Sequence, residues 1–256
     1  MIIGAQLFSV RDTCATQEGL NDTLRAMAAI GYQAVQLSGF SYDAEKTREA
    51  ADSFGLKIGI THTPTAELLG NLDKVIADHK TIGAKTVGFG HPKGYLVDRV
   101  VQHEKLLADL LPVSERLKKE GLKFAYHNHA MEFADLGGYT TMDYLYEHTD
   151  WDFILDVGWC DVAGYDVLRA IEKFSDRLEQ IHLKDFRPAL PTDEKPGQRI
   201  VPLYKGAVPL DEAIRALEKA GTKIAYVEQD NAPDSGNSWK DMKISFDALK
   251  ERGWVK

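Results

Sequence analysis

The stretch Gly83-Ala84-Lys85-Thr86-Val87 decides the fold, because its pattern recurs along the chain. In each copy a glycine is followed by one residue, then by lysine or glutamine, and then by mostly apolar residues. The other copies are Gly31–Val35, Gly55–Gly59, Gly121–Ala125 and Gly221–Ala225. A glycine just past a helix end can adopt the left-handed conformation that closes the helix, and a short apolar run is typical of a buried strand. Each copy therefore predicts a change from helix to strand.

The segments before these copies have helical periodicity. Leu20, Leu24 and Met27, for example, have the spacing of one helix face. Further apolar runs lack the glycine and bring the expected strands to eight, near residues 5, 35, 60, 87, 125, 154, 181 and 226. These runs are Ile2–Val10, Asp152–Val157 and Leu178–Leu183.

Eight alternations of strand and helix predict an α/β fold, a single (β/α)8 TIM barrel that fills residues 1–256 as one domain. The length suits such a barrel, which needs roughly 250 residues. The alternative is an open, doubly wound sheet. Against it, Ser9-Val10-Arg11-Asp12 follows the first expected strand, where a dinucleotide-binding fold would have its glycine-rich fingerprint.

Composition narrows the classes of function. The chain is 44% hydrophobic and carries a formal net charge of −8, which argues against disorder and disfavours a nucleic-acid partner. Its only cysteines, Cys14 and Cys160, imply no disulfide framework and fit a reducing compartment. The sequence begins without a basic leader, and no uncharged apolar run reaches the roughly 20 residues of a membrane helix. We expect a cytoplasmic protein that does not bind membranes.

Polar side chains end several of the expected strands. They are His62 in the third, Tyr126-His127-Asn128-His129 with Glu132 beyond in the fifth, Asp156 in the sixth, His182-Leu183-Lys184-Asp185 in the seventh and Glu228-Gln229-Asp230 in the eighth. In a barrel these strand ends meet at one mouth. Buried carboxylates and imidazoles require partners, so four consecutive strands ending this way predict a divalent metal site. The alternative is a structural network of polar groups.

Some motifs are specific when they are taken together. They are Gln6–Asp12, Tyr126–Phe133, Leu155–Trp159 with Ala163-Gly164, Ile181–Asp185 and Val227–Asp230. Over nearly its whole length the sequence resembles the xylose isomerase-like barrel family, in its sugar phosphate isomerase/epimerase branch. The resemblance implies the same barrel and an enzyme that acts on sugars.

The resemblance also implies one divalent metal ion, held by side chains from strands five to eight. Asp156, His182 and Glu228 match three ligand positions. His127 stands where many relatives have glutamate, so we expect His127 as the fourth ligand, with Glu132 reaching back from the loop as the alternative. Manganese or zinc is expected, with cobalt, iron or magnesium as alternatives. Trp159 replaces the histidine that apurinic endonucleases of this fold use for their metal cluster, so nuclease activity is not expected.

Proton transfer beside a carbonyl, through an enediolate, is the chemistry that the resemblance implies. Glu228 and Glu132 are the expected bases, with His129 as a partner. Lys184 could stabilise an oxyanion, and its alternative role is an ion pair with a carboxylate such as Asp185.

Side chains with apolar surface or hydrogen-bonding nitrogen are the candidates for substrate contact: His62, Trp159, Phe8 and Phe186. The aromatic residues could form a wall against a sugar ring or pack under loops, and His62 could be structural. The Phe186–Lys205 segment, with four prolines, is a lid candidate whose alternative is a solvated loop.

The resulting prediction is a metal-dependent isomerase or epimerase that acts on a non-phosphorylated sugar or keto-sugar. An alternative is a lyase or dehydratase on the same scaffold, which would expel water from an inosose or the aglycone from a 3-keto-glycoside. A barrel that binds a sugar without turnover is a further alternative. The expected partner is the small sugar substrate, and a homo-oligomer stays open.

Overall fold

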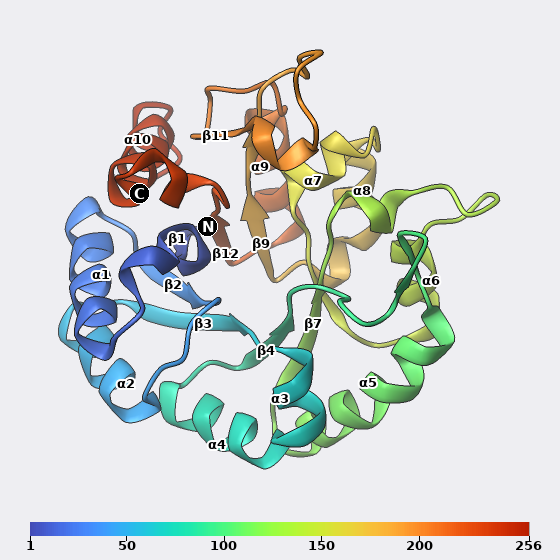
Figure 1. Cartoon of the computed structure of the whole chain (residues 1–256), viewed down its shortest axis with the longest axis horizontal. Coiled ribbons are helices and arrows are strands. Elements are labelled where there is room, and N and C mark those ends of the chain that lie inside the picture. The colour runs from blue at the N-terminus through green and yellow to red at the C-terminus, as the bar shows by residue number, and fades with distance from the viewer. Residues whose placement is uncertain (256) are drawn as a thin grey trace.

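The computed structural model describes residues 1–255 and contains the predicted barrel (Figure 1). Its eight parallel strands pair in the order β8-β7-β4-β3-β2-β1-β12-β9. An isolated parallel bridge between Asp156 and His182 joins the two outer strands and nearly closes the barrel. The strands are β1 (Ile2–Gln6), β2 (Ala34–Leu37), β3 (Lys57–His62), β4 (Thr86–Phe89), β7 (Lys123–His127), β8 (Asp152–Ile154), β9 (Gln180–Leu183) and β12 (Ile224–Val227). Each lies where the apolar runs predicted a strand.

Helices surround the strands, as Figure 1 shows. The α-helices are α1 (Gln17–Ile30), α2 (Ala44–Ser53), α3 (Thr65–Gly70), α4 (Leu72–Ile82), α5 (His103–Lys119), α6 (Thr141–His148), α7 (Val157–Val162), α8 (Val167–Phe174), α9 (Leu210–Ala220) and α10 (Ser238–Glu251). The first apolar run is only partly a strand, because η1 (Leu7–Thr13) is a 3-10 segment. α5 continues through Pro112 as one helix. No helix of residues 1–255 has the length and apolarity needed to cross a membrane.

The glycines of the repeated pattern close helices, as predicted. All five have positive φ angles, from 69° to 121°. Gly83 ends α4 and Gly221 ends α9 in the left-handed conformation, where a side chain would be strained. The repeated pattern is therefore a local stop signal that sets where five of the strands begin.

The core has two layers. A large cluster lies between strands and helices, and a smaller one fills the barrel interior with Ala34, Ile60, Ala125, Ile154, Ile224 and Tyr226. The smaller cluster forms the floor beneath the barrel mouth.

Tyr226 closes the lower part of the barrel. Its hydroxyl donates a 2.8 Å hydrogen bond to Gln180 Oε1, and Gln180 Nε2 donates to the Gly59 carbonyl at 3.2 Å. Glycines make room for this ring: a Cβ on Gly4 would lie 2.6 Å from Tyr226 Cδ1, and one on Gly59 only 2.0 Å from Tyr226 Oη. The floor is thus packed and hydrogen-bonded, and it supports the residues above it.

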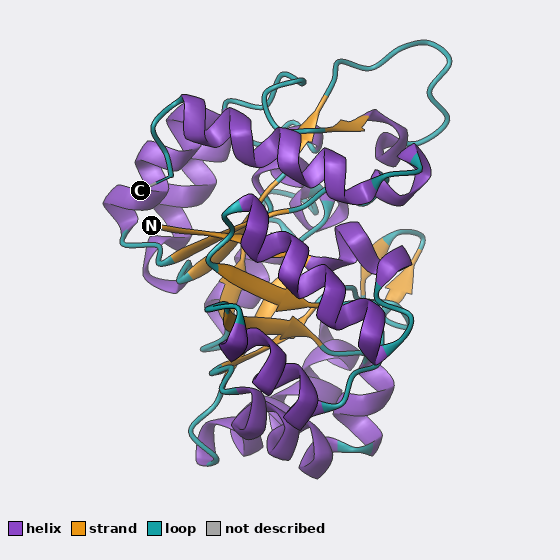
Figure 2. Ribbon diagram, turned by 90° about the vertical axis from the view of Figure 1, so that its left-hand side faces the viewer, coloured by secondary structure: helices purple, strands orange, loops and turns teal. Residues whose placement is uncertain are grey.

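The proline-rich segment after β9 is a long loop that is held at its base by two short strands. β10 (Asp185–Phe186) pairs antiparallel with β11 (Ile200–Val201) at its base, and η4 (Pro196–Arg199) precedes β11. Arg187 binds both carboxylate oxygens of Asp193 at 2.6 and 2.9 Å. The loop stands above the rest of the chain in Figure 2. The other short strands are β5 (Leu96–Val97) and β6 (Val100–Val101).

Candidate metal centre and active site

Alternation along the strands brings the polar side chains to the mouth. Successive side chains of a strand point to opposite faces, so residues two positions beyond an interior residue also face inward. Ala125 precedes His127, Ile154 precedes Asp156, and Tyr226 precedes Glu228 by two residues in this way. The apolar floor and the polar layer above it therefore come from the same inward faces.

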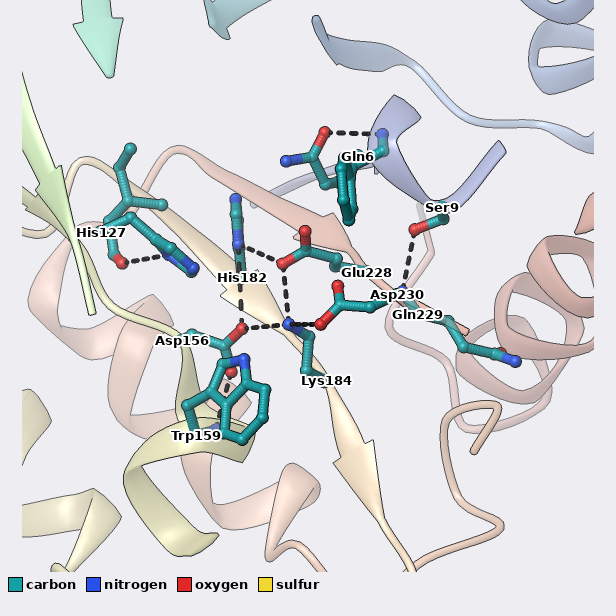
Figure 3. A network of polar contacts seen from close by, with 12 residues as sticks. Gln6, Ser9, His127, Asp156, Trp159, His182, Lys184, Glu228, Gln229 and Asp230 are labelled. Atoms are coloured by element: carbon teal, nitrogen blue, oxygen red, sulfur yellow. Dashed lines mark hydrogen bonds and ion pairs between the residues drawn. The ribbon is translucent and has the colours of Figure 1, made fainter. Parts of the chain in front are cut away.

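Strands β7, β8, β9 and β12 deliver one buried cluster. Ligand atoms of His127, Asp156, His182 and Glu228 all lie within 4.8 Å of one another, and all four side chains are buried. Figure 3 shows them converging from separate strands. Asp156, His182 and Glu228 follow or belong to the neighbouring strands β8, β9 and β12. This set is the one that the sequence predicted, with His127 and not Glu132 in the cluster.

The imidazoles of His127 and His182 are each oriented by a hydrogen-bond partner outside the cluster. His127 Nδ1 lies 3.3 Å from the carbonyl of Ile154, which can only accept, so this nitrogen carries the proton and Nε2 keeps its lone pair. His182 Nε2 lies 2.7 Å from Gln36 Oε1, which leaves Nδ1 as the free nitrogen. Such hydrogen bonds fix the tautomer of metal-binding histidines. Burial lowers the pKa of His127 well below its usual value, and the neighbouring His182 adds to this effect.

Lys184 places an ammonium group beside the carboxylates. Its Nζ donates a hydrogen bond to Asp230 Oδ2 at 3.1 Å and lies 3.0 Å from both Asp156 Oδ2 and Glu228 Oε2 (Figure 3). Burial alone would lower the pKa of Lys184, but Asp156, Asp230 and Glu228 outweigh it and the pKa rises. Burial raises the pKa of Asp230 to about 6, against the opposing effect of Lys184. The sequence named Asp185 as a partner of Lys184, but Asp185 instead accepts from the backbone of Phe186, Gly206 and Val208.

The cluster has the electronic character of a cation site. Asp156 Oδ2, Glu228 Oε2 and His182 Nδ1 are buried, and apart from the Lys184 ammonium and one another they have no polar partner within the described chain. His182 Nδ1 lies 2.7 Å from Glu228 Oε2, so one cation could bind both atoms. Three carboxyl groups surround the one ammonium of Lys184, and buried charge without a partner is costly. The residues present therefore fit a divalent cation.

A cavity of about 480 Å³ opens above this cluster, and Glu228, His127 and Lys184 line it. Two of the predicted contact residues, His62 and Phe8, also line it. Burial, with a smaller effect of His182, lowers the pKa of His62 to about 3, so this imidazole is neutral.

The cavity presents neutral imidazole nitrogen to a ligand. The buried atoms His62 Nε2 and His129 Nδ1 have no hydrogen-bond partner within residues 1–255. Gly90 makes space for His62, because a Cβ there would lie 2.6 Å from His62 Nδ1. Burial, followed by the charge of Lys184, lowers the pKa of His129 well below its usual value. Both residues can exchange hydrogen bonds with uncharged hydroxyl or carbonyl groups.

Glu132 does not line the cavity, and its side chain instead caps a 3-10 segment. It belongs to η2 (Ala130–Phe133), where its carboxylate accepts from the His129 backbone N–H at 2.7 Å and from Tyr126 Oη at 3.1 Å. Burial raises its pKa to about 7, against the lowering effect of these hydrogen bonds. This geometry gives Glu132 a role in holding the loop after β7, whereas its expected roles as a base or metal ligand would need it in the cavity.

The buried Glu132 predicts a pH-dependent stability. Its carboxyl keeps a proton in the folded chain up to about pH 7, whereas it ionises near pH 4.5 when unfolded. Rising pH between these values therefore destabilises the wild type, by up to about 3 kcal/mol. We expect Glu132→Gln to become more stable relative to the wild type as the pH rises from 5 to 8. Urea unfolding across this range measures the difference, and Glu49→Gln on the exposed face of α2 is the control. A constant difference would contradict the prediction.

The remaining aromatic candidates lie beside the cavity. Trp159 packs edge-on against the buried Phe186 with ring centres 4.9 Å apart, and its ring lies 5.3 Å from Lys184 Nζ. Neither Trp159 nor Phe186 is among the residues lining the cavity. Phe8 does line it and is backed by the guanidinium of Arg11 at 4.0 Å. The sugar-wall role thus fits Phe8, and packing describes Phe186.

Three residues near the site had no predicted role: Asp230 and Asn128, which stand among the polar strand-end residues, and His91. Asp230 and His91 line the cavity, and Asn128 holds the backbone of Asp156 by accepting from its N–H at 2.9 Å and donating to its carbonyl at 3.3 Å. Asp230 was detectable, since it follows Glu228 by two residues and so shares its inward face. His91 lies in a loop, where alternation gives no signal.

Comparison with known sequences settles the family. A family model described as "Xylose isomerase-like TIM barrel" matches residues 24–252. The chain belongs to this family. Among curated proteins, an inosose dehydratase of Lacticaseibacillus casei is 27% identical over 206 residues, which cover 73% of this chain but only 62% of that protein.

Solved structures of the xylose isomerase-like fold superpose over nearly the whole chain. A sugar phosphate isomerase/epimerase from Parabacteroides distasonis ATCC 8503 has a TM-score of 0.79 with 22% identity and covers 99% of each chain. The IolI protein with a bound zinc atom has a TM-score of 0.75 with 13% identity, over 98% of this chain and 97% of IolI. At these identities the similarity shows a shared fold.

Proposed function

We propose that this protein is a metal-dependent isomerase or epimerase that transfers a proton beside the carbonyl of a sugar or keto-sugar. The observation that carries the proposal is the convergence of His127, Asp156, His182 and Glu228 in one cluster beside a cavity that His127 and Glu228 line. Family membership and the zinc-bound IolI structure support it.

These four side chains would hold one divalent ion, for which manganese or zinc suits a mixture of imidazole and carboxylate ligands. When bound, the ion would polarise the substrate carbonyl and stabilise negative charge that develops on its oxygen. The close approach of His182 Nδ1 to Glu228 Oε2, at 2.7 Å in a buried space, supports this assignment.

The chain supplies the acid–base groups around the cavity. Glu228 faces the cavity as a carboxylate, because Lys184 and then His182 outweigh the effect of burial and hold its pKa well below the usual value. It can accept a proton from carbon. His129 and His62 present neutral imidazole nitrogens to the same space, where they can return a proton or bind a hydroxyl. Lys184 carries positive charge that can stabilise an oxyanion.

The substrate is proposed to be uncharged. The cavity lining contains no arginine among the described residues, and Lys93 is the one lysine there without a carboxylate partner in the described chain. Lys184 is already paired with three carboxylates. A phosphate ester would find no arginine and only one unpaired lysine among the lining residues, which gives its charge few direct partners.

A dehydratase is the second candidate, because the curated relative is named inosose dehydratase. The same base could remove the proton and then give it to the departing hydroxyl, which leaves as water. The first steps are identical, so the two reactions differ only in the fate of the neighbouring hydroxyl.

Solvent isotope exchange tests the proposal. Metal-stripped protein reloaded with manganese or zinc would be incubated in D2O with a panel of ketohexoses, ketopentoses and inososes. We expect deuterium beside the carbonyl of at least one substrate, together with a new stereoisomer or positional isomer by chromatography and NMR. A product that has lost one water relative to the substrate would favour the dehydratase. Binding of a sugar without exchange or product over the panel would refute both enzymes and favour a sugar-binding protein.

A further inference from the structure

Lys184 and a divalent ion would compete for the same oxygens. Lys184 Nζ lies 3.0 Å from Asp156 Oδ2 and 3.0 Å from Glu228 Oε2, and its side chain is 1% exposed. These two oxygens belong to the proposed metal ligands. The protein thus carries a cation of its own next to the place where the ion would bind.

The ammonium group is held in this position from several sides. Asp230 Oδ2 accepts its hydrogen bond, and the Trp159 ring lies 5.3 Å from Nζ. The helix α7 packs directly onto this strand end, because a Cβ on Gly158 would lie 2.6 Å from the Lys184 carbonyl oxygen. Lys184 therefore has little room to leave the cluster.

We propose that Lys184 is an internal cation that keeps the carboxylates together in the metal-free protein and lowers the affinity of the site for divalent ions. The inference rests on the proposed metal site. Without an ion, Asp156, Glu228 and Asp230 would repel one another in a buried space, and Lys184 offsets that repulsion. With an ion present, the same ammonium lies close to a second positive charge, which weakens ion binding.

Two consequences follow if Lys184 both stabilises the metal-free cluster and weakens ion binding. The chain folds before it binds an ion, unlike sites whose ligands come together only with the metal. The bound ion also exchanges readily, since Lys184 can again neutralise the oxygens that the ion leaves.

The test compares Lys184→Met with Lys93→Met, which removes an ammonium from the same cavity without touching the carboxylate cluster. Metal-stripped samples would be examined by thermal unfolding, and Mn²⁺ alone would be titrated by calorimetry. We expect metal-stripped Lys184→Met to unfold about 10 °C lower than the wild type. We expect it to bind Mn²⁺ at least about tenfold more tightly, and Lys93→Met to stay near the wild type in both measurements.

The double variant Lys184→Met/Asp230→Asn separates local competition from overall charge. It loses one ammonium and one carboxylate, so its cluster keeps the net charge of the wild type, and it removes one of the repelling groups that could prevent Lys184→Met from folding. Tighter Mn²⁺ binding than in the wild type would support competition at Asp156 and Glu228. Unchanged or weaker binding would overturn the inference while leaving the metal site itself intact.

Failure of the metal site would give a different result. If the wild type bound no Mn²⁺ but Lys184→Met did, Lys184 would act as the internal cation. The proposal that the wild type depends on a metal would then be wrong. If neither bound Mn²⁺, both the metal site and the inference would be refuted.

Discussion

Glu228→Gln is expected to lower the rate of proton exchange in the metal-loaded protein by about 10²- to 10⁴-fold, the usual contribution of a positioned base. The substitution keeps the size of a side chain that is 5% exposed and removes only its charge. It also takes one negative charge from His182 and Lys184, so weaker metal binding should accompany the loss. Deuterium incorporation at saturating Mn²⁺ separates the two effects.

Glu179→Gln is the matched control for this variant. Glu179 lies just before β9, at the opposite end of the barrel, where it pairs with Lys123 and Lys223. The same isosteric change there should leave exchange at the wild-type rate. If Glu228→Gln retained most of its activity while bound to metal, Glu228 would not be the base, and His129 or His62 would take its place as the candidate.

Gly59→Ala is expected to destabilise the fold by about 3 kcal/mol, near the upper end for an inserted methyl group in a packed core. The added Cβ would lie 2.0 Å from Tyr226 Oη and 2.6 Å from Gln180 Oε1. Neither group can retreat without breaking the hydrogen bonds of the barrel floor. Urea unfolding of the variant measures the loss.

A second substitution tests the stated cause. Tyr226→Phe removes the hydroxyl that the new methyl group would meet, so the double variant should be more stable than the sum of the two single losses predicts. Gly70→Ala is the control, because nothing lies within 4 Å of a Cβ at that helix end. If the two losses of stability were strictly additive in the double variant, the contact with the Tyr226 hydroxyl would not be the cause of the strain.

The fold was predictable because its signals are local. A glycine such as Gly83 or Gly221 ends a helix through its own backbone angle, and the apolar run that follows is typical of a buried strand. The strand-end residues were predictable for a related reason. Parallel strands bring their carboxyl ends to one edge, so the sequence position of Asp156 or His182 already implied its place in space.

Other parts of the site depend on the path of a loop or on long-range contacts. Glu132 and His129 are three residues apart, yet one turns back to cap a 3-10 segment and the other faces the cavity. The three-way pairing of Lys184 involves groups on β8 and β12, so sequence spacing suggested Asp185 instead. Gln36 orients His182 across 146 positions in the chain, a relation that no local pattern can carry.

The seam between β8 and β9 has a consequence for engineering this scaffold. Asp156 and His182 form the bridge that joins the two outer strands, and the His182 amide donates to the Leu155 carbonyl at 2.9 Å. These backbone contacts at the junction of the two strands hold in place two side chains of the proposed metal site. Libraries aimed at new substrates should therefore leave this pair fixed and diversify Phe8, His62 and His91, which border the same cavity away from this junction.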